Sequence, residues 1–274
     1  MLKNMLEISS LCKTFNVGTI NEVTSLQNVT LSIEEGSFVC VLGTNGSGKS
    51  TLLNAVAGTF LTDSGTIILK GKDITRKPEF KRASQIGRVF QNPFSGTAPG
   101  MSIAENLALA AKRGKKRGLG WGLSASVLNE LKSRVKVLNM GLEERLETPI
   151  GKLSGGQRQA LTLLMSSWIK PDLLLLDEHT AALDPKTASK VIEVTERIVM
   201  EGNLTTLMVT HSMQQAVNLG DRIIMMHQGQ IKYDFRGEEK KRLKVQDLLS
   251  LFDELRRKDQ IDTAVAELLI HEYV

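Results

Sequence analysis

The chain has 274 residues, of which 41% are hydrophobic and 24% charged, as is typical of one large or two small soluble globular domains. No stretch approaches the roughly 18 to 20 consecutive apolar residues of a membrane-spanning helix, and the N-terminus lacks the apolar region of a signal peptide, which together predict a cytoplasmic location. The net charge of +5 is compatible with anionic ligands or membrane headgroups and is too weak to argue for nucleic acid as a partner.

Short segments near the N-terminus predict an antiparallel layer beside a parallel core. Residues 5–9 and 29–33 alternate apolar and polar side chains, and residues 66–69 follow an Asp-Ser-Gly turn. Alternation of this kind is typical of half-exposed strands. Phe15 lies among these segments, ahead of the loop described next, and we interpret it as a ring that stacks on an adenine face. A phenylalanine of the core is the alternative.

The strongest local pattern lies at residues 43–50, which match G-x-x-x-x-G-K-S/T, a phosphate-binding loop. An apolar run precedes it at residues 38–42 and a helical pattern follows at 51–57, so the loop joins a buried strand to a helix. Its glycines let backbone N–H groups point at phosphate oxygens, and the helix N-terminus adds partial positive charge. A plain glycine-rich turn is the alternative, and the flanking strand and helix argue against it.

Two side chains of this loop predict how it holds a nucleotide. We expect Lys49 to reach the β- and γ-phosphates and the Ser50 hydroxyl to bind Mg²⁺. The predicted nucleotide-binding residues of the loop are Gly43, Thr44, Asn45, Gly46, Ser47, Gly48, Lys49, Ser50 and Thr51.

Gln91 stands at the end of a further apolar strand, predicted over residues 86–90. In open α/β sheets, ligands collect beyond the carboxyl ends of the strands, so Gln91 is expected to contact Mg²⁺ or a water. The next residues, 92–100, hold two prolines and two glycines and predict a loop that acts as a hinge.

Helical patterns follow at residues 101–111, where Ser102 and Glu105 are spaced as a capping box, and at 123–139. The basic run between them, residues 112–118, would meet phospholipid headgroups or an acidic partner if it were functional. A solvated loop between helices is the interpretation we favour.

The segment 153–158 reads Leu-Ser-Gly-Gly-Gln-Arg and precedes a helix predicted over residues 159–168. Ser154 has the chemistry of an N-cap, and glycines open the backbone around it. A helix start of this kind binds anions, so the segment predicts a second phosphate site.

A fully apolar strand, residues 173–176, ends in two carboxylates, Asp177 and Glu178. Four successive leucines cannot face water, so this strand is central. Asp177 is expected to hold Mg²⁺ directly or through water, and Glu178 to polarise an attacking water as general base. Two exposed acids in a turn would not explain why they follow so apolar a strand. His211 ends the strand predicted over residues 204–210 in an equivalent position.

The composition becomes helical from residue 238 onward, with two apolar stripes. These stripes pack on the body of the protein or meet a partner, and we favour the body. The first consists of Val245, Leu248, Leu249, Phe252 and Leu255, and the second of Ile261, Val265, Leu268 and Leu269.

With the phosphate loop, the Leu-Ser-Gly-Gly-Gln run, the Asp177-Glu178 pair and His211 in this order, the chain resembles the ATP-binding subunit of an ABC transporter over about residues 5–235. The resemblance implies an α/β fold, a P-loop NTPase (RecA-like) core with an antiparallel β subdomain and an inserted α-helical subdomain. It implies an ATPase domain at 1–237, with the helical subdomain inserted at about 92–166, and a C-terminal helical extension at 238–274.

The resemblance also assigns roles to single residues. Residues 43–50 become the Walker A loop and 173–177 the Walker B strand. Phe15 becomes the adenine-stacking aromatic, and Gln91 the Q-loop glutamine that ties the catalytic Mg²⁺ to a transmembrane partner.

The remaining assignments concern the residues around hydrolysis. Glu178 is the catalytic base, Asp184 the D-loop acid and His211 the switch histidine that contacts the γ-phosphate. The signature residues are Ser154, Gly155, Gly156 and Gln157. One position departs from the family, because His179 stands where proline is usual; we expect it to loosen or re-aim the turn after the base.

The family resemblance further implies ATP and Mg²⁺ as cofactors and three protein partners. A second copy pairs head to tail, so that each signature covers the other copy's ATP. A transmembrane permease holds the chain at the cytoplasmic face of the membrane, an extracytoplasmic substrate-binding protein delivers the solute, and no nucleic acid is involved.

The transported solute is the least determined feature. Residues 91–101, 173–186 and 238–249 resemble bacterial ATPases assigned to tryptophan/tyrosine importers, which predicts import of a small solute, such as one of these amino acids. An exporter ATPase is one alternative. A soluble ABC ATPase of translation or repair is another, and the single ATPase domain and the lack of an inserted heptad run argue against it.

Overall fold

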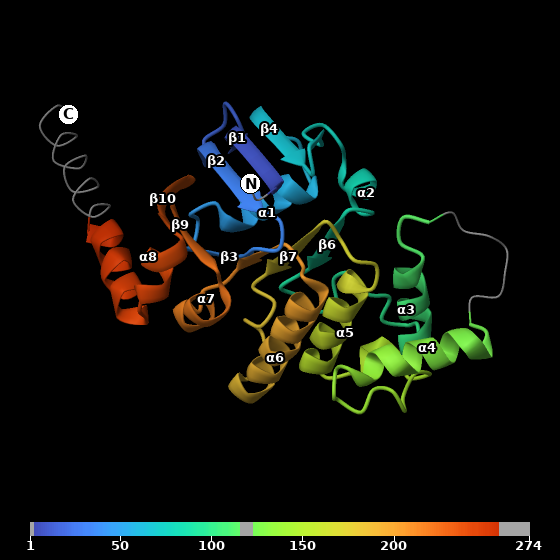
Figure 1. The fold of residues 1–274 in the computed structure, drawn as a ribbon. Coiled ribbons are helices and arrows are strands. Elements are labelled where there is room, and N and C mark those ends of the chain that lie inside the picture. Colours follow the sequence, from blue (N-terminus) through green and yellow to red (C-terminus); the bar gives the residue numbers. More distant parts are fainter. Residues whose placement is uncertain (1–2, 116–122, 258–274) are drawn as a thin grey trace, which may run out of the picture.

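The computed structural model describes residues 3–115 and 123–257 of the chain. Two sheets with helices packed around them form its body, and the helical region and the C-terminal helices lie at opposite ends (Figure 1). The basic run at 112–118 lies partly, and the second C-terminal apolar stripe wholly, outside the described residues.

A six-stranded sheet forms the core, in the order β10-β9-β3-β8-β7-β6. The strands are β3 (Phe38–Gly43), β6 (Ile86–Val89), β7 (Leu173–Asp177), β8 (Thr206–Val209), β9 (Arg222–His227) and β10 (Gln230–Phe235). All neighbouring pairs are parallel except the β9–β10 hairpin. β3, β8 and β9 are buried along their whole length, which explains why they appear in the sequence as continuous rather than alternating apolar runs.

The predicted antiparallel layer is a four-stranded sheet in the order β2-β1-β4-β5. Its strands are β1 (Asn4–Phe15), β2 (Val23–Glu34), β4 (Ser64–Leu69) and β5 (Lys72–Asp73). Helix α1 (Lys49–Ala57) and one face of β3 complete the apolar cluster that joins this layer to the core sheet. Val39 and Val41 belong to this cluster, whereas Cys40 and Leu42 belong to the cluster on the other face, because side chains alternate along a strand.

Helices α3 (Ile103–Ala111) and α4 (Ala125–Lys136) form the helical region beyond β6, together with α5 (Gly155–Ser167) (Figure 1). The capping box predicted for the first of them is present: Ser102 Oγ accepts a hydrogen bond from Glu105 N, and Ser102 N donates to Glu105 Oε2. Helix α5 begins at Gly155 rather than at 159, because the glycines that follow the Ser154 cap are already helical.

Helix α6 (Pro185–Gly202) packs on α5, and α7 (Met213–Leu219) packs on β3. The short elements are α2 (Glu79–Arg82), the 3₁₀ turn η1 (Ile150–Lys152) and α8 (Gly237–Arg242). A last helix covers residues 245–257, and its Leu248, Phe252 and Leu255 lie in the main apolar core, so the first C-terminal stripe packs on the body as predicted. Among the described helices, none is long and apolar enough to cross a membrane.

Candidate functional site

The phosphate loop connects β3 to α1 and leaves the first turn of that helix open. Gly48 precedes the helix with φ +94°, no side chain caps the helix N-terminus, and its first turn carries no acidic residue. A Cβ at Gly48 would meet Ser25 O at 2.4 Å, so both the backbone conformation and the space require glycine. The uncapped N–H groups and the helix dipole therefore remain available to an anion.

Lys49 lies inside this loop. Its Nζ donates hydrogen bonds to Gly43 O and Thr44 O, both at 2.9 Å, and the side chain is buried. Burial lowers the pKa of the ammonium, while the nearby carboxylates of Glu178 and Asp177 act to raise it. The amine is thereby held at the centre of the loop, where a phosphate would add the counter-charge.

Asp177, at the end of β7, faces the loop from the neighbouring part of the sheet. Ser50 Oγ lies 3.5 Å from Asp177 Oδ1, and Arg88 Nη2 lies 3.9 Å from Oδ2. Burial raises the pKa of the carboxyl, Arg88 opposes that shift, and the adjacent Glu178 adds to it. A cation between Ser50 and Asp177 would relieve this unfavourable burial of charge.

Glu178 contacts two other predicted site residues, Gln91 and His211. His211 Nε2 lies 2.7 Å from Glu178 Oε1, and Gln91 Nε2 donates to Glu178 Oε2 at 3.3 Å. These three residues follow β8, β6 and β7, whose carboxyl ends lie at one edge of the sheet. Glu178 itself has φ +44°, an uncommon conformation for a residue other than glycine that re-aims the chain directly after the strand.

Mg²⁺ fits this set of donors. The described residues contain no group of three or more His, Cys, Asp or Glu side chains that would hold a metal ion by themselves. Mg²⁺ is bound in nucleotide sites through one or two protein oxygens together with phosphates and waters, and the Ser50 hydroxyl and the Asp177 carboxylate are placed to supply the protein oxygens. Gln91, the third predicted ligand, contacts Glu178 in this structure.

The signature forms a separate unit with the turn before α6. Ser154 and Gln157 make a capping box at the start of α5. A Cβ at Gly156 would clash with Thr187 Cγ2, so the lack of a side chain lets α5 lie this close to α6 without displacing Thr187. Asp184 caps α6 by accepting a hydrogen bond from Thr187 N at 3.1 Å. Throughout 3–115 and 123–257, no hydrogen bond or ion pair joins the signature residues to the phosphate loop.

Phe15 ends β1 and packs edge-on against Phe60, with ring centroids 5.2 Å apart. Lys13 Nζ lies 5.3 Å from the centre of the Phe15 ring. The half-buried ring is compatible with both earlier interpretations, and adenine stacking stays a prediction.

His179, which stands where the family usually has proline, is buried. Its Nε2 lies 3.0 Å from Thr195 Oγ1, whose hydroxyl donates to Val191 O, so the imidazole Nε2–H is the donor. Burial lowers the pKa of His179 to about 4, so the ring is neutral. His179 ties the residue after the base to the middle of α6, which does not loosen the turn; the other expected effect, a re-aimed turn, stays a prediction.

Two parts of the site were not predicted. Arg88 lies on β6, three residues before Gln91, and its guanidinium contacts Asn54 and Asp177. A second connection runs from Thr210 through Gln215 to Thr180, with distances of 2.8 and 3.2 Å. The sequence does hold one signal for Arg88, since it is a cation inside an apolar strand. The connection from Thr210 to Thr180 depends on the placement of α7, which the sequence does not show.

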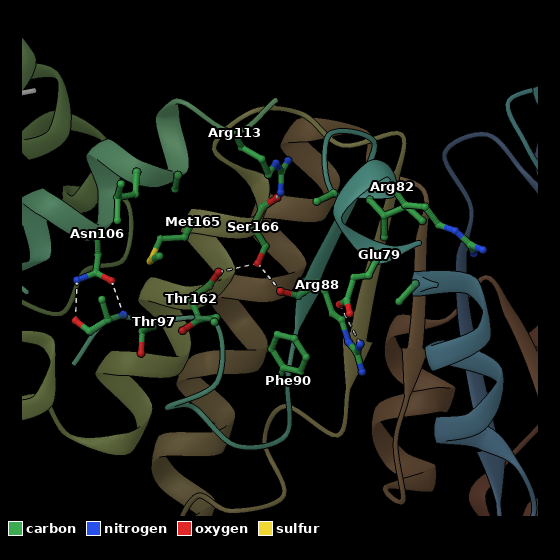
Figure 2. A pocket seen from close by; sticks show the side chains of 17 residues that line it. Glu79, Arg82, Arg88, Phe90, Thr97, Asn106, Arg113, Thr162, Met165 and Ser166 are labelled. Atoms are coloured by element: carbon green, nitrogen blue, oxygen red, sulfur yellow. Dashed lines mark hydrogen bonds and ion pairs between the residues drawn. The ribbon is translucent and has the colours of Figure 1, made fainter. Parts of the chain in front are cut away.

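A groove of about 550 Å³ opens between β6, α3 and α5 (Figure 2). Asn106, almost fully buried, holds the predicted hinge loop there by bonding both the N–H and the carbonyl of Ala98. Phe90, the residue before Gln91, also lines the groove. The groove therefore borders the segment that carries Gln91 to Glu178.

Comparison with known proteins agrees with the geometry of the site. The family described as ABC transporter matches residues 26–181, more than half of the chain, which therefore belongs to this family and is a transporter ATPase that binds and hydrolyses ATP. Its fold is the P-loop NTPase fold of the ATP-binding cassettes.

The chain is 45% identical to a tyrosine transport ATP-binding protein of Clostridioides difficile, over 91% of this chain and 99% of the relative. It is 36% identical to a sulfate/thiosulfate import ATP-binding protein of Chromobacterium violaceum, over 84% of this chain and 58% of the relative. Among solved structures it resembles a dimeric post-hydrolysis state of the ATP-binding cassette MJ0796 bound to ADP and Pi, with 28% identity and a TM-score of 0.72 over 85% of this chain and 98% of that one.

Proposed function

We propose that the chain powers import of a small solute through a separate permease, by ATP hydrolysis between two head-to-tail copies. The observation that carries the proposal is the convergence of Gln91, Glu178 and His211 at the sheet edge that also bears the phosphate loop. Hydrolysis needs a base beside the γ-phosphate and a group that senses it, and these side chains supply both.

In this proposal Lys49 and the uncapped start of α1 bind the phosphates, and Ser50 and Asp177 hold Mg²⁺. When bound, Mg²⁺ neutralises charge on the phosphate oxygens. Glu178 orients the attacking water and accepts its proton, and His211, already 2.7 Å from that carboxylate, turns toward the γ-phosphate.

A second copy completes the site, because the signature unit of one chain stands apart from that chain's own phosphate loop. The open face of the loop and the α5 N-terminus each present N–H groups without contacting one another. Head-to-tail pairing lets both bind the same nucleotide, and the dimeric MJ0796 cassette supports this arrangement.

The permease binds at the groove beside Phe90 in this proposal. A segment inserted there would press on the strand end that carries Gln91, and Gln91 contacts Glu178. The groove thereby links the binding of a membrane partner to the position of the base.

The solute is proposed to be an aromatic amino acid such as tyrosine or tryptophan, delivered by an extracytoplasmic binding protein. The support is the 45% identity with the tyrosine transport relative along nearly the whole chain, against 36% and 35% with the sulfate/thiosulfate and spermidine/putrescine import ATPases of the comparison. The chain would then work at the cytoplasmic face of the membrane.

The test is to recover the tagged Glu178→Gln chain from its native cells in detergent with Mg·ATP and to identify the co-purifying proteins by mass spectrometry. A polytopic membrane protein together with a secreted or lipid-anchored binding protein is expected, and that binding protein is then titrated with tyrosine and tryptophan. A polytopic protein alone would favour an exporter. Ribosomal proteins or nucleases without a membrane partner would contradict the transport role.

A further inference from the structure

Arg88 places a charge in the otherwise apolar strand β6, whose sequence is Ile-Gly-Arg-Val. The strand carries this side chain to the wall of the groove of about 550 Å³, close to Phe90, and the side chain is only 12% exposed (Figure 2). Burial of a guanidinium is costly unless its N–H groups find acceptors. The partners of Arg88 therefore show what the charge does at this place.

Two uncharged side chains anchor the guanidinium to the helix that begins at the phosphate loop. Arg88 Nη2 donates a hydrogen bond to Asn54 Oδ1 on α1, and Nη1 donates to Thr59 Oγ1, just beyond the end of α1, at 3.0 Å. The guanidinium also lies over the Phe90 ring, 4.3 Å from its centre. Arg88 is thereby fixed to the same helix whose first turn forms part of the phosphate site.

Two carboxylates approach the anchored guanidinium from different elements. Glu79 Oε1, on α2 in the groove wall, lies 3.5 Å from Nη1, and Asp177 Oδ2, at the end of β7, lies 3.9 Å from Nη2 (Figure 2). Both distances exceed the roughly 2.7–2.9 Å of a close charged hydrogen bond, so the two carboxylates share Arg88. The other oxygen of Asp177, Oδ1, is the one beside the Ser50 hydroxyl. Arg88 therefore holds this carboxylate turned so that Oδ1 remains available to a metal ion.

We propose that Arg88 is a positioning residue for Mg²⁺ that orients the Asp177 carboxylate, and that Glu79 links this role to the groove by sharing the same guanidinium. The inference rests on the Mg²⁺ site and the permease groove of the proposed function. Glu79 is half-exposed and lines the groove, so a cationic side chain of the docked permease takes over its charge. Arg88 then contacts Asp177 more closely, and Mg²⁺ binding strengthens while the partner is in place.

The test measures metal binding separately from hydrolysis, in the full-length chain with ADP. The affinity for a fluorescent ADP analogue is measured in EDTA and in saturating Mg²⁺, and the ratio of the two affinities is the gain due to the metal. The electron paramagnetic resonance signal of bound Mn²⁺ is a second readout, and thermal unfolding checks the fold. The variants are Arg88→Lys, Arg88→Gln, Glu79→Gln, and Glu79→Gln combined with Arg88→Gln. Arg134→Lys is the control, because Arg134 is likewise stacked on a ring, that of Trp168 at 4.4 Å, but lies in the helical region.

Arg88→Lys and Arg88→Gln are expected to lower the metal-dependent gain by roughly 10- to 100-fold, because side chains that orient a metal ligand contribute this much to metal affinity. Lysine keeps the charge but replaces the planar fork of donors with a single ammonium, so it does not restore the orientation. The affinity in EDTA should stay unchanged in both. Glu79→Gln should raise the gain by about two- to fivefold, as is typical of a half-exposed ion pair, and only where Arg88 is present. Arg134→Lys should leave the gain as it is.

Charge alone predicts the opposite result for Arg88→Gln, since removal of a cation beside a metal site tightens metal binding. Tighter or unchanged metal binding in this variant, an unchanged gain in Arg88→Lys, or equal losses of affinity in EDTA and in Mg²⁺ would overturn the positioning role. If Arg88→Gln does not fold, Arg88→Lys decides. A Glu79→Gln chain that shows no effect, or an effect that persists without Arg88, would overturn the link to the groove. If the unmodified chain binds ADP equally well with and without Mg²⁺, the Mg²⁺ site of the proposed function itself fails, and the inference fails with it.

Discussion

The phosphate side and the signature side of this chain are built in different ways. The phosphate loop is backed by buried strands. Its lysine donates to carbonyls of the loop, Ser50 lies beside Asp177, and Glu178 contacts His211. The signature side is a helix start whose cap is satisfied within its own turn and whose glycines are packed against α6. The phosphate side is a nearly complete nucleotide site, whereas the signature side, in the proposed dimer, would bind a nucleotide held by a second copy.

In the proposed head-to-tail dimer, this difference would keep a single chain from hydrolysing ATP alone. Binding would depend on groups that the core sheet positions, and the final phosphate contacts would depend on a second copy. His179 connects the two sides, because it follows the base and bonds to Thr195 on α6, the helix that supports the signature.

The largest effect is expected from Glu178→Gln. Loss of a general base lowers phosphate release by about 10²- to 10⁴-fold, while ATP binding is retained and the ATP-bound dimer accumulates. Steady-state phosphate release and size-exclusion chromatography in Mg·ATP measure both. Glu201→Gln, the same change at the exposed end of α6, is the control and should behave as the unmodified chain. Near-normal turnover, or a monomer in saturating Mg·ATP, would contradict the prediction.

Lys49→Ala removes the buried ammonium of the phosphate side. Charged hydrogen bonds contribute about 1.5–3 kcal/mol each, so ATP affinity should fall by roughly 10- to 100-fold in the monomer. Isothermal titration with ATP checks this, with the exposed Lys190→Ala as the matched control. Unchanged affinity in Lys49→Ala would mean that the loop does not hold the phosphates as proposed.

His179, which connects the phosphate side to the signature side, predicts that the stability of the protein depends on pH. His179 has a folded-state pKa of about 4 against about 6.5 when unfolded, so the unfolded chain binds more protons between these values. The stabilisation is fully present well above pH 6.5 and is lost as the pH falls toward 4, by about 1.6 kcal/mol between pH 6.5 and 5. Urea unfolding at several pH values measures it.

A His179→Asn chain cannot titrate at this position, so its stability should fall less steeply over the same range. Identical slopes for the two chains would show that another group causes the acid sensitivity.

The smallest expected effect is that of removing the helix cap on the signature side. Ser154→Ala removes the α5 cap and costs about 1 kcal/mol of stability. It should leave ATP affinity of the monomer unchanged and lower hydrolysis. Ser102→Ala removes the matching cap of α3 and should cost as much stability without lowering hydrolysis. If both variants hydrolyse ATP equally well, the two sides are not functionally distinct in the way proposed.

The local features of the site could be predicted from the sequence because their causes are local. The phosphate loop is eight consecutive residues between a strand and a helix, and the capping boxes at Ser102 and Ser154 span four residues each. Continuous apolar runs likewise distinguish buried parallel strands from the alternating antiparallel ones.

Other features required the tertiary structure. Gln91 and Glu178 lie 87 residues apart and meet only because β6 pairs with β7. The environment of His179 follows from the packing of α6, so only the structure shows that this residue, expected to loosen or re-aim its turn, is bonded to that helix. The C-terminal helix reaches the phosphate loop only because its apolar face is buried in the core beside α7. Sequence alone therefore determined the chemistry and the local conformation of the motifs, whereas strand order and helix packing, which depend on contacts between distant segments, decided which motifs meet.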